Sequence, residues 1–174
     1  MLVVVMGVSG VGKTTIGREL ARRLGAGFLE GDDFHPASNV AKMRRGEPLE
    51  DADRWPWLDR LAGELGRADA EGRRLVLACS ALKRAYRDRL RAGASDLRFV
   101  CLVGDPVEIG RRLRQRSGHF MPPGLLESQL LALEPPSGDE NAIVVEVEAA
   151  PQAIVSEITH RLAASPSPSP GKLL

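Results

Sequence analysis

Short apolar runs alternate with longer segments of helical spacing along most of the chain. The runs are rich in Val and Leu and occupy residues 2–6, 75–79, 99–103 and 143–147, with a weaker candidate at residues 27–30. Such runs are typical of strands buried on both faces of a parallel sheet, and the segments between them of crossover helices. The pattern therefore predicts a three-layer α/β domain around a central, parallel, five-stranded sheet.

The segments between and after these runs have the apolar spacing of helices. We expect helices at residues 13–24, 36–45, 53–71, 82–91, 106–115, 122–133 and 151–163. Asp105 followed by Pro106 is a typical helix start, because Asp caps a helix and Pro suits its first position. We expect a single domain over residues 1–164. Residues 165–174 repeat Ser-Pro and are predicted to form a disordered tail.

A glycine-rich motif follows the first predicted strand. It reads Gly7, Val8, Ser9, Gly10, Val11, Gly12, Lys13, Thr14. This order matches G-x-x-x-x-G-K-[ST], the phosphate-binding loop (P-loop), between a strand and a helix. Backbone N–H groups of such a loop bind phosphate oxygens, Lys13 would bridge the β- and γ-phosphates of ATP, and the Thr14 hydroxyl would ligate Mg²⁺. Thr15 is included among the expected ATP-binding residues.

A P-loop alone does not separate kinases from nucleotide switches or assembly factors. The run at residues 75–79 ends before Ser80 rather than before the acidic residue typical of switch NTPases, which favours a kinase. Asp32 follows the run at residues 27–30, and the carboxyl ends of parallel strands meet at one edge of the sheet. Asp32 is therefore predicted to accept the proton of the acceptor hydroxyl. The alternative is that Asp32 and Asp33 only cap a turn.

Three further stretches carry motifs more specific than the P-loop. The first spans residues 28–36, read as Phe-Leu-Glu-Gly-Asp-Asp-Phe-His-Pro, and is followed by Asp53-Arg54 and Pro56-Trp57-Leu58. The second spans residues 79–88, read as Cys-Ser-Ala-Leu-Lys-Arg-Ala-Tyr-Arg-Asp, and the third comprises residues 118–122, Ser128-Gln129 and Leu133-Glu134. In this order the motifs resemble the gluconate kinase family, over about residues 3–160.

The resemblance implies a specific reaction, the ATP-dependent phosphorylation of D-gluconate at its 6-hydroxyl to give 6-phosphogluconate and ADP. It also implies an adenylate-kinase- or shikimate-kinase-like fold, a mobile lid at about residues 111–124, and a homodimer. A kinase of the same fold acting on shikimate or another small molecule is the closest alternative. A catalytically idle nucleotide-binding regulator is the alternative from another class, although neither the P-loop nor the carboxylate is missing.

Gluconate is a polyhydroxylated anion, so its pocket should offer a cation and several hydrogen-bonding groups. The candidates for binding it are Asp32, His35, Lys42, Arg45, Arg54, Ser80, Lys83, Arg87 and His119. Plainer alternatives exist for several of them. Lys42 and Arg45 could only solvate a helix face, and Arg87 could only pair with an acid such as Asp88 or Glu19.

A basic run at residues 111–116 lies where the resemblance implies a lid. Arg112 and Arg116 share one helical face and are predicted to contact the ATP phosphates when the lid closes and excludes water. The alternative is a solvated helix face. Residues 149–152 are expected to contact the adenine base. Trp55 and Trp57 are expected to anchor a helix rather than to stack on a sugar.

Composition and charge add little to the predicted fold and function. The 174 residues have a formal net charge of +1, and four Phe and one Tyr give a nucleic-acid kinase little support. Cys79 and Cys101 lie in or beside apolar runs, which suits a reducing compartment. The first apolar run is too short for a signal peptide, and no stretch reaches the 18 apolar residues of a membrane span. We expect a cytoplasmic protein that binds neither membranes nor nucleic acid.

Overall fold

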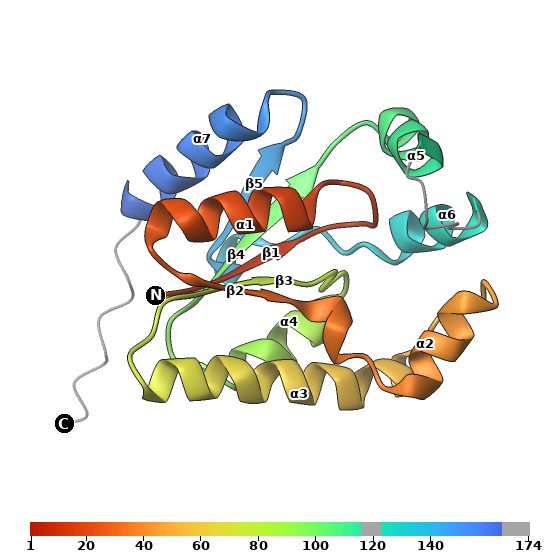
Figure 1. Cartoon of the computed structure of the whole chain (residues 1–174), viewed down its shortest axis with the longest axis horizontal. Coiled ribbons are helices and arrows are strands. Elements are labelled where there is room, and N and C mark those ends of the chain that lie inside the picture. Colours follow the sequence, from red (N-terminus) through yellow and green to blue (C-terminus); the bar gives the residue numbers. More distant parts are fainter. Residues whose placement is uncertain (116–122, 165–174) are drawn as a thin grey trace.

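The protein is described by a computed structural model covering residues 1–115 and 123–164. A five-stranded sheet lies between two layers of helices (Figure 1). Its strands are β1 (Leu2–Met6), β2 (Gly27–Glu30), β3 (Leu75–Ala78), β4 (Leu97–Val103) and β5 (Ala142–Glu146). They are parallel and lie in the order β2-β3-β1-β4-β5. The predicted five-stranded parallel sheet is therefore confirmed.

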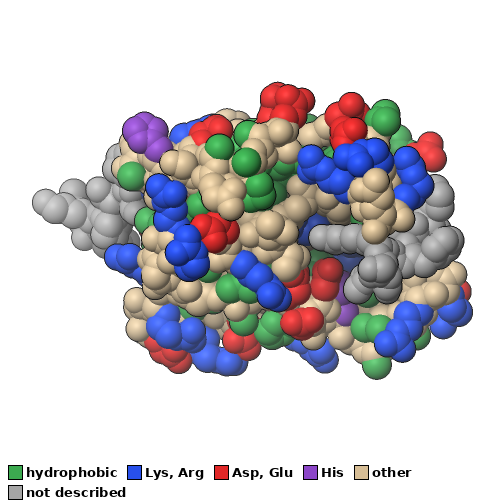
Figure 2. Space-filling model, turned by 45° about the horizontal axis from the view of Figure 1, so that its top comes forward, with side chains coloured by type: hydrophobic (Ala, Val, Ile, Leu, Met, Phe, Trp, Pro, Cys, Tyr) green, Lys and Arg blue, Asp and Glu red, His purple; other side chains and the backbone are tan. Residues whose placement is uncertain are grey.

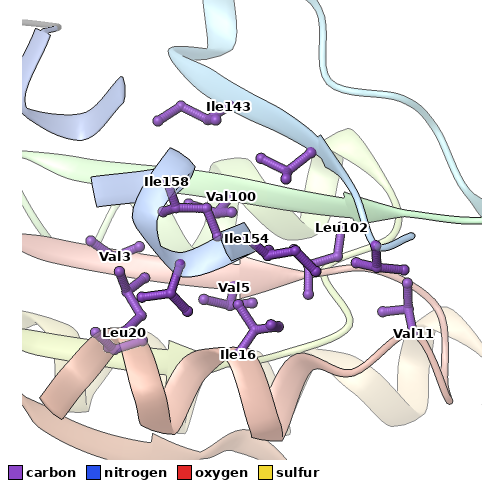
Figure 3. Close-up of a cluster of buried hydrophobic side chains, with 14 of the residues drawn as sticks. Val3, Val5, Val11, Ile16, Leu20, Val100, Leu102, Ile143, Ile154 and Ile158 are labelled. Carbon is purple, nitrogen blue, oxygen red and sulfur yellow. The ribbon is translucent and has the colours of Figure 1, made fainter. Parts of the chain in front are cut away.

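Alternate side chains of β1 enter two separate hydrophobic cores, as the twofold repeat of a strand requires. Val3 and Val5 pack with α1 (Lys13–Leu24) and α7 (Pro151–Ala164) on one face (Figure 3). Leu2, Val4 and Met6 pack on the other face. That face is covered by α3 (Asp51–Ala70) and α4 (Arg84–Arg91). Both faces of β1 are buried, which explains its uninterrupted apolar sequence.

Four of the remaining elements gather near the carboxyl ends of the strands (Figure 1). They are the 3-10 turn η1 (Gly31–Phe34), α2 (Ala37–Arg44), α5 (Pro106–Gln115) and α6 (Pro123–Ala132). The 3-10 turn η2 (Gly138–Glu140) directly precedes β5 and therefore lies at the amino end of that strand. Asp105 caps α5 as predicted, because its carboxylate accepts the N–H of Val107 at 2.8 Å. The sequence therefore predicted each of the seven α-helices within the described residues, but neither of the two 3-10 turns.

Two helix starts differ from the predicted ones by two residues. Helix α3 begins at Asp51, two residues earlier than expected, because Glu50 and Asp53 form a reciprocal capping box. Helix α4 begins two residues later than expected, at Arg84, because Lys83 before it is extended, with φ −94° and ψ 150°. Local features thus set both boundaries, a capping box at α3 and an extended residue ahead of α4.

Two predicted features fall partly or wholly outside the described residues. The lid expected at residues 111–124 includes residues 116–122, and the tail expected at residues 165–174 lies wholly beyond residue 164. Among the helices of residues 1–115 and 123–164, none is long and apolar enough to cross a membrane.

Arg87, which was predicted to bind substrate, is instead a buried structural residue. Its side chain is wholly buried, and its Nε and Nη2 atoms donate to the Glu140 carboxylate at 2.5 and 2.8 Å. Its Nη1 atom donates to three backbone carbonyls. The prediction is wrong because no nitrogen of this guanidinium is left for a ligand. The partner is also neither Asp88 nor Glu19.

The Arg87–Glu140 pair should make a large contribution to stability. Arg87 lowers the pKa of Glu140 from 4.5 to about 2, so the stabilisation is present above pH 4.5 and is lost as the pH falls toward 2. Glu140→Gln leaves the Arg87 charge buried and unpaired, which should lower the free energy of unfolding by about 3 kcal/mol. Urea unfolding at pH 7 measures this.

The matched control is Asp59→Asn, which breaks the exposed pair between Asp59 and Arg89. It should change the free energy of unfolding by less than about 1 kcal/mol. Equal effects of the two substitutions would contradict the structural role of the buried pair.

Candidate active site

The P-loop turns between β1 and α1 in a conformation that depends on its glycines. Gly7, Gly10 and Gly12 have φ values of 138°, 83° and 108°, which other residues rarely adopt. A Cβ atom on Gly7 would also lie 2.6 Å from the carbonyl oxygen of Leu102. The N–H of Gly7 donates to the carbonyl of Ser80 at 3.2 Å. The loop is thus fastened to the segment that follows β3.

Glu30 is a site residue to which the sequence analysis gave no role. It is the last residue of β2, and its carboxylate hydrogen-bonds with the Thr14 side chain at the start of α1. Burial raises the pKa of Glu30 above its ordinary value, while the Thr14 hydrogen bond and the Lys13 charge oppose this shift. The amino group of Lys13 donates to the Val8 carbonyl at 3.1 Å. The end of β2 and the P-loop therefore form one site.

Asp32 lies on the turn η1, which is held rigidly on both sides. A Cβ atom on Gly31 would lie 2.5 Å from the Ala78 carbonyl oxygen, so only glycine allows this close approach. Trp57 donates its indole N–H to the Gly31 carbonyl at 2.7 Å, and the His35 ring stacks on it with centroids 4.2 Å apart. The Asp32 side chain remains 73% exposed, with an oxygen 4.0 Å from His35 Nε2. A fixed turn thus presents an accessible carboxylate.

Cys79, directly after β3, marks the point on which three predicted site residues converge. Burial raises the pKa of its thiol to about 12, so Cys79 is a neutral packing residue, as its sequence context predicted. The charges of Asp32, Lys13 and Arg54 all act on this thiol. The P-loop before Lys13 and the turn that carries Asp32 also contact the backbone at this strand end, through Gly7 and Gly31.

Three of the predicted substrate-binding cations are already paired with carboxylates. The pairs are Lys42 with Asp53 at 2.8 Å, Lys83 with Asp51 at 2.7 Å, and Arg45 with Glu47 at 2.7 Å. Arg54 differs from them. Over residues 1–115 and 123–164 it makes no ion pair, and its guanidinium donates to the Leu49 carbonyl at 3.3 Å and lies 5.7 Å from the Tyr86 ring centroid. Of these four cations, Arg54 is thus the one that makes no ion pair with a carboxylate within those residues.

A pocket of about 300 Å³ lies on the other side of the P-loop. Its lining includes residues 10–12 of the loop, Arg112 of α5, and Val147, Ala149 and Pro151 ahead of α7 and at its start. The Arg112 guanidinium lies 3.5 Å from the Val147 carbonyl oxygen. Basic side chains gather over α5, which contains Arg111, Arg112 and Arg114, beside a hollow in this face of the molecule (Figure 2). Arg112 and the loop expected to contact adenine therefore face one pocket.

The other predicted site residues have less definite places. Arg116 and His119 lie outside the described residues. Ser80 is half-buried, and its backbone carbonyl receives the Gly7 hydrogen bond. Trp57 anchors α3 in the core as expected, since it is wholly buried. Its hydrogen bond to the Gly31 carbonyl, which also fixes the Asp32 turn, has no local sequence signal.

The sequence is similar to those of known proteins. Residues 2–136 match a family model described as an AAA domain. The chain is 49% identical to a gluconokinase of Gluconobacter oxydans (strain 621H), over 89% of this chain and 87% of the relative. It is 48% identical to a thermosensitive gluconokinase of Escherichia coli (strain K12), over 81% of this chain and 75% of the relative.

The fold is similar to those of solved kinase structures. A gluconokinase from Sinorhizobium meliloti 1021 is 44% identical, with a TM-score of 0.85 over 93% of this chain and 91% of that one. A shikimate kinase from Aquifex aeolicus vf5 has a TM-score of 0.59 at 18% identity, over 94% of this chain and 97% of that one. The second likeness shows the shared fold alone.

The contact between Asp32 and His35 can be tested by titration. Burial lowers the pKa of His35 below 6.5, and the nearby Asp32 charge partly offsets this by favouring the protonated imidazole. Asp32→Asn removes that charge, so the pKa of His35 should fall further. The pH dependence of the imidazole resonances in NMR spectra measures it. Asp33→Asn, at the exposed neighbour, should leave the titration nearly unchanged; an unshifted His35 in Asp32→Asn would show that the two side chains are not in contact.

Proposed function

The chain belongs to the gluconokinase family, and on this basis we propose that it transfers the γ-phosphate of ATP to the 6-hydroxyl of D-gluconate. The products are 6-phospho-D-gluconate and ADP. The P-loop with Lys13, the turn with Asp32 and the helix with Arg54 meet at the carboxyl end of β3, and this arrangement supports the reaction most directly. These side chains offer one group for the phosphates, one for the hydroxyl proton and one for the sugar-acid carboxylate.

The P-loop side of the site suits ATP. Its backbone N–H groups and Lys13 would bind the phosphates at the positively polarised start of α1. The 300 Å³ pocket beside residues 10–12 would take the adenosine part, with Arg112 and Pro151 at its walls. Arg116 is proposed to contact the phosphates because helical spacing places it on the same face as Arg112.

The residues beside the P-loop also fit Mg²⁺. This ion prefers oxygen ligands and is usually held by one or two protein groups together with substrate phosphates. The Thr14 hydroxyl, next to the Glu30 carboxylate, offers that chemistry. Throughout the part of the chain that the structure describes, no cluster of three or more His, Cys, Asp or Glu side chains could hold a metal. The Thr14 hydroxyl of the P-loop motif would hold the ion, which when bound neutralises charge on the phosphates.

In the proposed transfer, Asp32 accepts the proton of the 6-hydroxyl as that oxygen bonds to the γ-phosphorus. The bond between the γ-phosphorus and the leaving oxygen of ADP breaks, and Lys13 stabilises the charge that moves onto the phosphates. Asp32 suits the role because its side chain is exposed while its backbone turn is fixed by Gly31 and Trp57. A fixed carboxylate reduces the cost of orienting the acceptor.

Arg54 is the proposed partner of the gluconate carboxylate. It projects from α3 near the Asp32 turn, and unlike Lys42, Lys83 and Arg45 its charge is not already paired among the described residues. A guanidinium can bind a carboxylate through two parallel hydrogen bonds. In this arrangement the carboxylate end and the 6-hydroxyl end of gluconate are recognised by different side chains.

A coupled ADP-release assay across acceptors tests the proposed reaction. Gluconate should turn over faster than shikimate, nucleoside monophosphates or adenylylsulfate. Faster turnover with shikimate than with gluconate would overturn the proposed substrate. ATP binding without turnover of any acceptor would instead favour a nucleotide-binding regulator.

The homodimer is proposed from the family resemblance, and the cytoplasmic location from the free, buried Cys79 and Cys101, which suit a reducing compartment. Sedimentation at graded protein concentrations tests the first, since a dimer should dissociate only on dilution. A monomer at all concentrations would contradict it.

Asp32 and Lys13 should both be required for turnover, for different reasons. Lys13→Ala should abolish turnover because the phosphates lose their cation. Asp32→Asn should lower kcat by at least about a hundredfold, because an amide cannot accept the hydroxyl proton. Steady-state kinetics measure both, with Asp33→Asn as the near-normal control. A near-normal kcat for Asp32→Asn would refute its role as the base.

Arg54→Leu should raise KM for gluconate by about tenfold or more, because a charge-assisted contact to the carboxylate is lost. KM for ATP should change little. Arg67→Leu is the matched control, since Arg67 lies farther along α3 and pairs with Glu64 on the same helix. If Lys83→Met or Lys42→Met raised KM for gluconate while Arg54→Leu did not, the carboxylate would bind elsewhere.

A further inference from the structure

The P-loop has more backbone freedom to lose than most loops because it contains three glycines with positive φ. Binding phosphate through backbone N–H groups requires those groups to hold fixed directions. Contacts that restrain the loop from outside should therefore reduce the entropy lost when the nucleotide binds.

Gln129 of α6 makes such a contact with the tip of the loop. Its Oε1 atom accepts the backbone N–H of Ser9 at 2.7 Å, and its Nε2 atom donates to the Ser9 hydroxyl at 3.1 Å. Both polar atoms of the Gln129 amide thus hydrogen-bond to Ser9, which is 120 positions away in the sequence. An uncharged side chain that donates and accepts together is required for this pairing.

The neighbouring loop residue is restrained by an apolar contact. A Cβ atom on Gly10 would lie 2.5 Å from Leu113 Cγ, so α5 packs directly on the loop. Helix α6 is itself anchored in the core, where Leu126 belongs to the same cluster as Val8 and Val11. Figure 1 shows α5 and α6 beside the turn that joins β1 to α1. Gln129 therefore projects from a supported helix onto the loop.

We propose that Gln129 is a positioning residue that holds the P-loop in its ATP-binding conformation through Ser9. The proposal rests on the nucleotide half of the proposed function and is independent of the acceptor. The proposal adds to the P-loop motif a side chain from a helix 120 positions away in the sequence. Loss of this contact leaves the phosphate-binding groups in place but less ordered before ATP arrives.

Gln129→Leu tests the proposal, because it keeps most of the side-chain volume and removes both hydrogen bonds. Titration calorimetry with ATP, in the absence of gluconate, should show a Kd raised roughly five- to tenfold. KM for gluconate should change by less than about twofold. Glu127→Gln, at an exposed position on the same helix, is the control and should leave the Kd for ATP unchanged.

Two further variants separate positioning from simple stability. Ser9→Ala removes only the hydroxyl end of the contact, so the Ser9→Ala/Gln129→Leu double variant should bind ATP no more weakly than Gln129→Leu. Gln129→Glu keeps an acceptor for the Ser9 N–H but adds a negative charge beside the phosphate site. It should therefore weaken ATP binding more than Gln129→Leu does.

Several results would overturn the proposal. An unchanged or tighter Kd for ATP in Gln129→Leu would do so, as would a lowered midpoint of urea unfolding without any change in that Kd. Strictly additive effects of the Ser9 and Gln129 substitutions would also contradict it. Failure of the wild-type protein to phosphorylate gluconate would contradict the proposed substrate while leaving the ATP measurements valid.

Discussion

The site depends on one constraint, the parallel pairing of β2, β3 and β1, which brings three carboxyl ends to the same edge of the sheet. Strand β3 is in the middle and ties the other two together. The P-loop after β1 donates from Gly7 to the Ser80 carbonyl, and the turn after β2 presses Gly31 against the Ala78 carbonyl. Because both attachments are to the backbone around the end of β3, Lys13 and Asp32 are held at fixed positions relative to each other.

Ion pairing distinguishes the basic residues that stabilise the fold from those that could bind a ligand. Arg87 is buried against Glu140, and through it α4 is tied to the segment ahead of β5. Lys42 and Lys83 are paired with carboxylates at the start of α3. Arg54 keeps a charge without an ion pair within the described ranges, and so it can serve an anionic substrate. Similar cations thus have different roles because of their surroundings.

Local sequence signals predicted most of the fold. Each apolar run and the glycine-rich motif span fewer than ten residues. The structure has the strands and the loop where these short signals predict them. The strand order and the residues that position the site could not be read in this way. Trp57 and Gly31 are 26 residues apart, and Gln129 and Ser9 are 120 apart. Arg87 was misassigned for the same reason, since its burial depends on Glu140 from a distant turn.

A crystal structure with gluconate and a nonhydrolysable ATP analogue tests the central claim most directly. The terminal phosphate should lie against the P-loop and Lys13, the 6-hydroxyl of gluconate within hydrogen-bonding distance of Asp32, and the gluconate carboxylate on Arg54. A different hydroxyl facing the terminal phosphate, or gluconate bound away from Asp32, would contradict it.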